Sequence, residues 1–86
     1  MTANIYTMPP DFVNEQGTEF WLDKSSSEYA HTKGLTTTNV YFVRHKDGGK
    51  TRLIIDNHLG KYLGEDTSIE GISTKLDMIY LDRNLK

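Results

Sequence analysis

A cluster of cationic side chains in the middle of the chain is the part of this sequence best suited to chemistry. Five basic or histidine side chains lie within nine residues: Arg44, His45, Lys46, Lys50 and Arg52. Guanidinium and ammonium groups bind phosphates and carboxylates through charge-assisted hydrogen bonds. Acid–base cleavage of RNA would need both a positioned base and a positioned acid, and His45 is the only candidate here. The cluster therefore predicts binding of an anionic partner rather than catalysis.

The stretch 39-56 must position this cluster, and it is typical of a β-hairpin. Two runs rich in β-branched and aromatic residues flank an Asp-Gly-Gly sequence at 47–49. Glycine adopts the positive φ angles that tight hairpin turns require. Depending on which two of these three residues form the turn, Val43 pairs with Arg52 or with Ile54.

Both of these registers predict the same two faces, because side chains alternate along a strand. One predicted face carries Val40, Phe42, Arg44, Leu53 and Ile55, and the other carries Tyr41, Val43, His45, Arg52 and Ile54. A three-residue loop would reverse the faces of one strand relative to the other. We expect a hairpin that is apolar on both faces where it joins the body of the protein and cationic at its tip.

Length and composition limit the class of protein. The chain has 86 residues, of which 36% are hydrophobic and 26% charged, so we expect one small globular domain, 1-86. The absence of cysteine excludes disulfides, thiolate zinc sites and a cysteine nucleophile, and it suits a reducing cytoplasm. The N-terminus lacks the regions of a signal peptide, and no apolar run approaches the ~20 residues of a membrane helix.

The charge is distributed unevenly although the net charge is only −2. Residues 33–61 contain six Lys or Arg side chains and two Asp side chains. Acidic side chains outnumber basic ones in both flanking segments, 1–32 and 62–86. This segregation predicts a positive potential in the central third of the sequence.

The segments before the hairpin predict strands and a short helix. Residues 3–8 could form a strand that ends at Pro9-Pro10. Residues 18–24 predict a strand with Glu19, Trp21 and Asp23 on one face. The size of Trp21 favours burial in the core over a role as a binding anchor. Two further features, a capping box formed by Ser25 and Glu28 and a glycine at position 34, predict a helix over 26–32, with a flexible loop as the alternative.

The segments after the hairpin are less regular. We expect a short strand around 61–63, a polar loop over 64–71 and a last strand over 72–82. A helix over 72–82 is the alternative, because Ile72, Leu76 and Ile79 also lie near one helical face. The predicted fold is α+β and mainly β: an antiparallel sheet of about five strands around the 39-56 hairpin, with one short helix near 26-32.

The sequence offers no assembled catalytic or metal site. His31, His45 and His58 are scattered, without the spacing of a metal motif. No nucleophile elbow or phosphate-binding loop is present. We therefore expect neither enzyme activity nor a metal or cofactor.

Two hypotheses of function remain, and both are binding functions. In the first, the cationic cluster, with Lys33 and Lys61, contacts phosphates of RNA, while Tyr41 or Tyr62 stacks on unpaired bases. In the second, the chain is an inhibitor or accessory subunit that occludes a larger protein, and Trp21 is one of its anchors. Our prediction combines them: a non-enzymatic, cytoplasmic binding protein whose basic hairpin engages a protein partner or a protein–RNA complex. Composition alone suggests an antitoxin-like or phage-encoded inhibitor, with a stand-alone RNA-binding module and a structural subunit without nucleic acid as alternatives.

Overall fold

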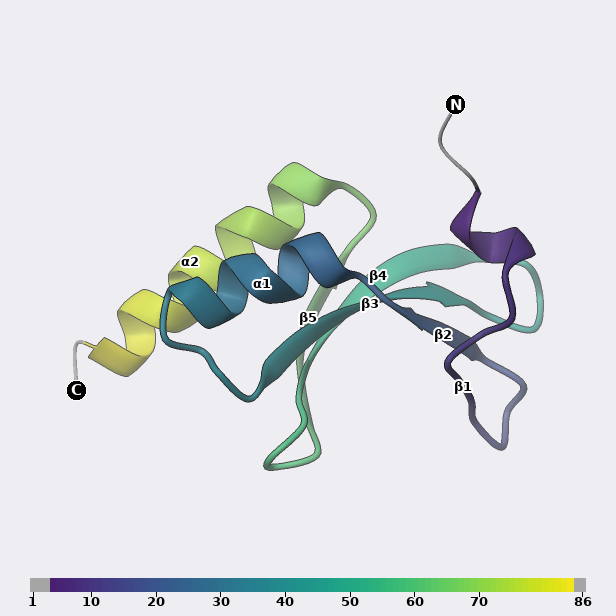
Figure 1. The fold of residues 1–86 in the computed structure, drawn as a ribbon, viewed down its shortest axis with the longest axis horizontal. Helices are drawn as coiled ribbons and strands as arrows, with labels where there is room; N and C mark the ends of the chain where they lie inside the picture. The colour runs from purple at the N-terminus through teal and green to yellow at the C-terminus, as the bar shows by residue number, and fades with distance from the viewer. Residues whose placement is uncertain (1–3, 85–86) are drawn as a thin grey trace.

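The computed structural model describes residues 4–84 and contains one antiparallel sheet with two α-helices (Figure 1). The five strands lie in the order of the sequence: β1 (Phe12–Val13), β2 (Glu19–Leu22), β3 (Thr38–Arg44), β4 (Lys50–Asp56) and β5 (Lys61–Asp66). Helix α1 (Lys24–Thr32) connects β2 to β3, and helix α2 (Ile69–Asn84) follows β5. The predicted five-stranded antiparallel sheet around the 39-56 hairpin is confirmed.

The register of the β3–β4 hairpin differs from both predicted registers. Val43 pairs with Thr51, and Arg44 pairs with Lys50. Gly48 donates its backbone N–H to the carbonyl of His45 and has φ +95°, so the loop is the three-residue type in which a turn is followed by a left-handed glycine. The odd loop length reverses β4 relative to β3, and the predicted face assignment was therefore wrong.

Helix α1 confirms the predicted short helix but starts earlier, because a different residue caps it. Asp23 accepts the backbone N–H of Ser26 at 3.2 Å and its hydroxyl at 2.9 Å, so Asp23 takes the capping role predicted for Ser25. The helix ends before Gly34, whose φ of +95° suits a residue that follows a helix C-terminus.

The last element is a helix, and the strand predicted over 72–82 was wrong. Asp66 accepts the backbone N–H of Ser68 at the helix start. Ile72 and Leu76, one helical turn apart, are both fully buried. The alternating pattern in this segment was misleading because burial against α1 and the sheet selects the 3.6-residue period instead.

The other predictions have mixed outcomes. Strands β2 and β5 confirm the strands predicted over 18–24 and 61–63, and β5 extends into the segment predicted as a loop. The described part of 3–8 contains a 3₁₀ turn, Ile5–Thr7, instead of a strand. Trp21 is only 2% exposed, as the core interpretation predicted.

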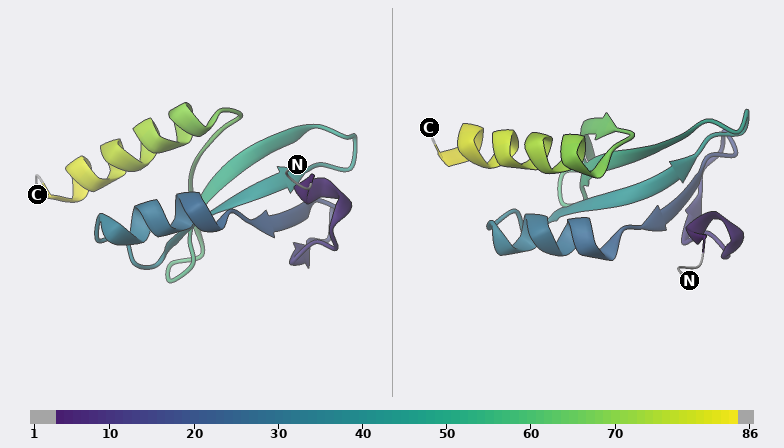
Figure 2. Two further views of the ribbon diagram at one scale, coloured as in Figure 1. Left: turned by 45° about the horizontal axis from the view of Figure 1, so that its top comes forward. Right: turned by 90° about the horizontal axis from the view of Figure 1, so that it is seen from above.

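The hydrophobic core lies between the two helices and one face of the sheet. Both helices cover the same end of this face, while the hairpin extends beyond them (Figure 2). The core consists of Ala30, Leu35, Val40, Ile54, Ile72 and Leu76. No helix within residues 4–84 is both long and apolar enough to span a lipid bilayer.

Candidate functional site: two opposite faces of the sheet

The observed register divides the side chains of the hairpin between two chemically different faces. Val40, Phe42 and Arg44 of β3 share the side of the sheet covered by the helices with Lys50, Arg52 and Ile54 of β4. We call this side the helix face. The opposite side, the open face, carries Tyr41 and Val43 of β3 with Leu53 and Ile55 of β4. The cations of the two hairpin strands therefore all lie on the helix face, and the open face carries none of them.

The cations on the helix face form a cluster with aromatic rings. We call Tyr6, Trp21, Phe42, Arg44, Lys50 and Arg52 the cation–aromatic cluster. The guanidinium carbon of Arg44 lies 5.2 Å from the centre of the Trp21 ring, and the Lys50 ammonium lies 4.8 Å from that of Tyr6. These distances are within the ~6 Å range of cation–π attraction. The 3₁₀ turn before β1 supplies Tyr6, which covers this end of the sheet.

Arg44 is neutralised by a carboxylate of the neighbouring strand. Glu19 of β2 pairs with Arg44 across the sheet. Its Oε1 accepts a hydrogen bond from Arg44 Nε at 2.8 Å and forms an ion pair with Nη2, also at 2.8 Å. The Arg44 side chain also contacts the rings of Tyr6 and Trp21. Its donors are therefore largely used within the chain.

Arg52 connects the starts of both helices. Its Nη1 donates to the carbonyl of Thr67, just before α2, and its guanidinium lies 5.0 Å from the Phe42 ring. Its Nε lies 3.8 Å from Oδ2 of Asp23, the residue that caps α1. Within residues 4–84 this buried Nε has no hydrogen-bond partner. The position of Arg52 indicates a structural role, in which one cation links two helix starts to the sheet.

Only part of the predicted cationic surface therefore remains exposed. Lys46 and Lys50 are exposed and have no carboxylate within 4.0 Å in the described part of the chain. His45 is exposed in the loop, where its Nδ1 lies 3.4 Å from the hydroxyl of Thr18. The interpretation of all five positions as one free docking surface fails for Arg44 and Arg52.

The remaining predicted site residues lie elsewhere. Lys33 of α1 forms an ion pair of 3.0 Å with Asp77 of α2, and its hydrogen bond to that carboxylate raises the pKa of Lys33. Lys61 and Tyr62 lie on β5, at the edge of the sheet, and Tyr41 lies on the open face. The structure thus gathers Arg44, Lys50, Arg52 and Trp21 on the helix face and places Lys33, Lys61, Tyr62 and Tyr41 apart from them.

Sequence reasoning missed the partners of the cations, although one pattern pointed to them. The alternation over 18–24 placed Glu19, Trp21 and Asp23 on one face, and this face is the one that meets Arg44 and Arg52. Pairing between β2 and β3 depends on α1, which lies between them in the sequence. Local patterns could not fix that register.

The open face is mostly apolar and is exposed only in part: Val43 and Phe20 are buried, and Tyr41 and Ile55 are half-buried. Phe12, Phe20 and Tyr41 form a row of rings, with centroid distances of 5.4 Å and 6.2 Å between neighbours. With Ile55 and Asn57 they line a hollow of about 290 Å³. Phe12 is 58% exposed. An antiparallel sheet with a solvated face usually presents polar side chains there, so this face is exceptional.

Neutral polar groups border the open face at the end away from the hairpin loop. Asn39 donates to Oδ1 of Asn57 at 2.9 Å, and Asn57 donates to the Tyr41 hydroxyl at 3.1 Å. The His31 ring nitrogen Nε2 lies 2.9 Å from Oδ1 of Asn39. These hydrogen bonds hold the amides in place, and they add no charge to this border.

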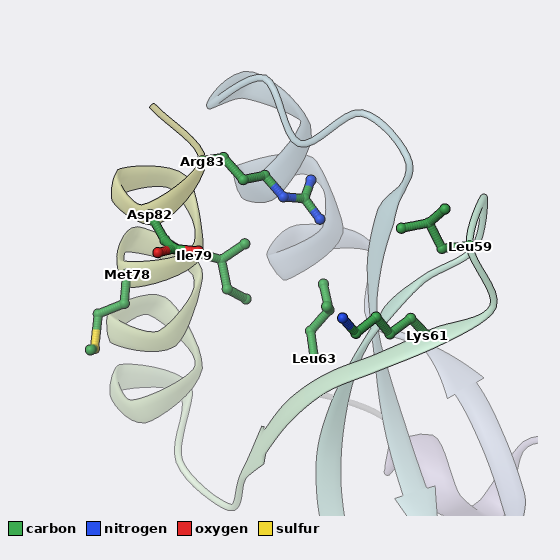
Figure 3. A pocket seen from close by; sticks show the side chains of 7 residues that line it. All are labelled: Leu59, Lys61, Leu63, Met78, Ile79, Asp82 and Arg83. Atoms are coloured by element: carbon green, nitrogen blue, oxygen red, sulfur yellow. The ribbon is translucent and has the colours of Figure 1, made fainter. Parts of the chain in front are cut away.

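A second hollow region lies between β5 and α2 (Figure 3). Two adjoining hollows of about 410 and 390 Å³ share Leu63, Met78 and Ile79. Figure 3 shows Ile79 and Leu63 directed toward each other across the gap, with Met78 directed away from β5. Lys61 and Arg83 reach into the same region, where Arg83 donates to the buried carboxylate of Asp56 at 3.1 Å.

No catalytic constellation emerges from these surfaces. Within residues 4–84 no three His, Asp or Glu side chains are placed to hold a metal ion. Comparison of the chain with protein-family models, with curated proteins and with solved structures finds no match. Function must therefore be inferred from the surfaces themselves.

Proposed function

We propose that this chain is a non-enzymatic protein-binding module, of inhibitor or accessory type, that docks on a larger protein through the open face of its sheet. The observation that carries the proposal is the row of Phe12, Phe20 and Tyr41 beside a hollow on the open face, with Phe12 58% exposed at its end. Aromatic anchors of this kind dominate the energetics of protein interfaces. The docking surface is thus the side of the hairpin opposite to its cations.

The size of the hollow and its border favour a protein as the occupant. Its volume of about 290 Å³ lies at or below the lower end of the ~300–1,000 Å³ typical of small-molecule sites. It suits one inserted side chain of a partner. The neutral amides of Asn39 and Asn57 at its border could hydrogen-bond a partner, as the polar rims of protein interfaces do.

The test begins with affinity purification of the tagged full-length chain with and without nuclease, followed by titration of the recovered partner in purified form. We expect Phe12→Ser to weaken the partner's affinity by about tenfold or more. Leu81→Ser is the matched control, because Leu81 is 53% exposed but lies on α2, away from the open face. Equal affinities of the two variants and the unsubstituted chain would contradict docking through the open face.

A second candidate function is the binding of RNA or another polyanion at the hairpin loop. Lys46 and Lys50, which have no carboxylate partner within the described chain, support it. The test is fluorescence anisotropy with single-stranded RNA at about 50 mM salt, where phosphate contacts are strong. Binding that falls steeply with salt and weakens in Lys46→Ala would support this function, and absence of binding would eliminate it.

A further inference from the structure

Strand β5 is an edge strand of the sheet that residues 4–84 form. Hydrogen bonds from His45 N to Gly49 O and from Asn57 N to Thr37 O show which residue pairs of β3 and β4 are hydrogen-bonded, because hydrogen-bonded and non-hydrogen-bonded pairs alternate along the strands. In this alternation Leu53 and Ile55 direct their backbone groups toward β3. Their partners on β5 are Glu65 and Tyr62, which therefore direct their N–H and C=O groups outward. An edge of this kind can pair with another strand.

The sequence of β5 is complementary to itself when it is read in the antiparallel direction. The strand is Lys-Tyr-Leu-Gly-Glu-Asp over 61–66. When two copies of this strand pair about a two-fold axis between Leu63 and Gly64, Lys61 of one copy lies opposite Asp66 of the other. The same register places Tyr62 opposite Glu65. Two ion pairs between the copies thus form at once, and cross-strand pairs of opposite charge are stabilising.

The bulge in β5 makes this register geometrically possible. A strand without a bulge would put residues 61 and 66 on opposite faces. The register shift between Ile54 and Ile55 instead places both residues on the helix face. Lys61 pairs with Asp56, whose carboxylate is bound by Arg83 of α2, and Asp66 caps the start of α2. Tyr62 and Glu65 both lie on the open face, where their side chains share a 3.1 Å hydrogen bond.

We propose that two copies of this chain form a symmetric dimer by antiparallel pairing of their β5 strands. The outward N–H and C=O groups of Tyr62 and Glu65 are the hydrogen-bonding pairs of this interface, and Lys61 and Asp66 form the ion pairs that fix its register. The two-fold axis is perpendicular to the sheet, so both sheets join edge to edge with all helices on one side. This dimer is independent of the proposed docking function, because it leaves the open faces uncovered.

The surroundings of the edge fit this arrangement. Leu59, in the turn before β5, and Tyr62 of β5 are 66% and 54% exposed. The hollows between β5 and α2 lie along the same edge (Figure 3). A second strand added here would shield part of the exposed Tyr62 side chain from water.

Sedimentation equilibrium of the full-length chain tests the proposal. We expect a concentration-dependent dimer whose dissociation constant rises with salt, since its register depends on exposed ion pairs. Lys61→Asp places two carboxylates opposite each other at both ends of the interface, and we expect it to raise the dissociation constant by about tenfold or more. Lys24→Asp makes the same change in charge on exposed α1 and should leave the dimer unchanged.

Disulfide trapping tests the register directly, because the chain has no cysteine of its own. Hydrogen-bonded antiparallel residues have Cα atoms about 5.5 Å apart, within the range of a disulfide. A mixture of Tyr62→Cys and Glu65→Cys chains should form a crosslinked pair on oxidation. A mixture of Tyr62→Cys and Lys46→Cys chains should not.

Two results would overturn the proposal. The first is a chain that stays monomeric up to about 1 mM, a concentration at which even weak complexes form. The second is a dimer that Phe12→Ser dissociates and Lys61→Asp does not, which would place the second copy on the open face. If Phe12→Ser lost binding to a different protein but still formed the dimer, that result would concern only the proposed docking function.

Discussion

The two faces of the β3–β4 hairpin satisfy their side chains in opposite ways. On the helix face, Arg44 and Arg52 lie among rings and carboxylates of the chain itself. On the open face, Tyr41 and Ile55 are half-buried and line a hollow. The two arginines are thus compensated within the chain, while part of the apolar surface of the open face stays exposed. In this protein the exposed apolar side chains are a stronger indication of a binding surface than the cations are.

The largest test of this contrast compares neighbouring residues of β4 that point to opposite faces. Ile54 is fully buried in the core, and Ile55 is partly exposed on the open face. We expect Ile54→Ala to lower the free energy of unfolding by ~2–5 kcal/mol through loss of contacts and a cavity. Ile55→Ala should lower it by only about 1 kcal/mol. Urea denaturation followed by the fluorescence of Trp21 measures both, and equal losses would contradict the face assignment.

The second test concerns the cations of the helix face. If Arg52 is structural, Arg52→Ala should lower the free energy of unfolding by ~1–3 kcal/mol, because the buried Asp23 carboxylate and the Thr67 carbonyl lose their partner. Lys50→Ala on the same strand should change it by less than about 0.5 kcal/mol, as expected of an exposed side chain. A reversal of this order would restore the interpretation of the hairpin as a free cationic surface.

A third test examines how α2 is attached to the end of the helix face. Alanine usually stabilises a helix relative to glycine. A Cβ atom on Gly71 would, however, collide with the carboxylate of Asp66 that caps the helix. We therefore expect Gly71→Ala to lower the Tm in differential scanning calorimetry. Gly64→Ala on β5 is the control, since its Cβ would meet only Cδ of Lys75 at 3.5 Å, and its Tm should change little.

The same contrast explains how much the sequence could predict. The strands that form the hairpin and β2 follow from their β-branched and aromatic residues, and they are present. The allocation of side chains to faces depends on one residue of loop length, and the position of Gly48 in the loop decided it. The partners Glu19 and Asp23 reach the cations only through pairing of β2 with β3 across α1. A local pattern contains no information about that long-range register.

The smallest expected effect is the dependence of stability on pH, which arises from carboxylates on the helix side. Burial raises the pKa of Asp56, but hydrogen bonds from Leu59 N, Thr37, His58 N and Arg83 outweigh it and lower that pKa overall. Hydrogen bonds from Tyr29 and Lys33 likewise lower the pKa of Asp77. A carboxyl group with a lowered pKa in the folded state contributes stability above its unfolded pKa of about 3.9, and that stability is lost as the pH falls through the folded value.

We therefore expect the free energy of unfolding to change little from neutral pH to about pH 5 and to decline below about pH 4. Asp77→Asn should reduce this decline, because Asp77 and its partners Tyr29 and Lys33 join α1 to α2 on the helix side. Glu15→Gln, an exposed carboxylate in the turn between β1 and β2, should leave the decline unchanged. Chemical denaturation at a series of pH values measures both variants. An equal reduction in the two would mean that the acid sensitivity arises from general surface charge and not from the carboxylates that join the helices.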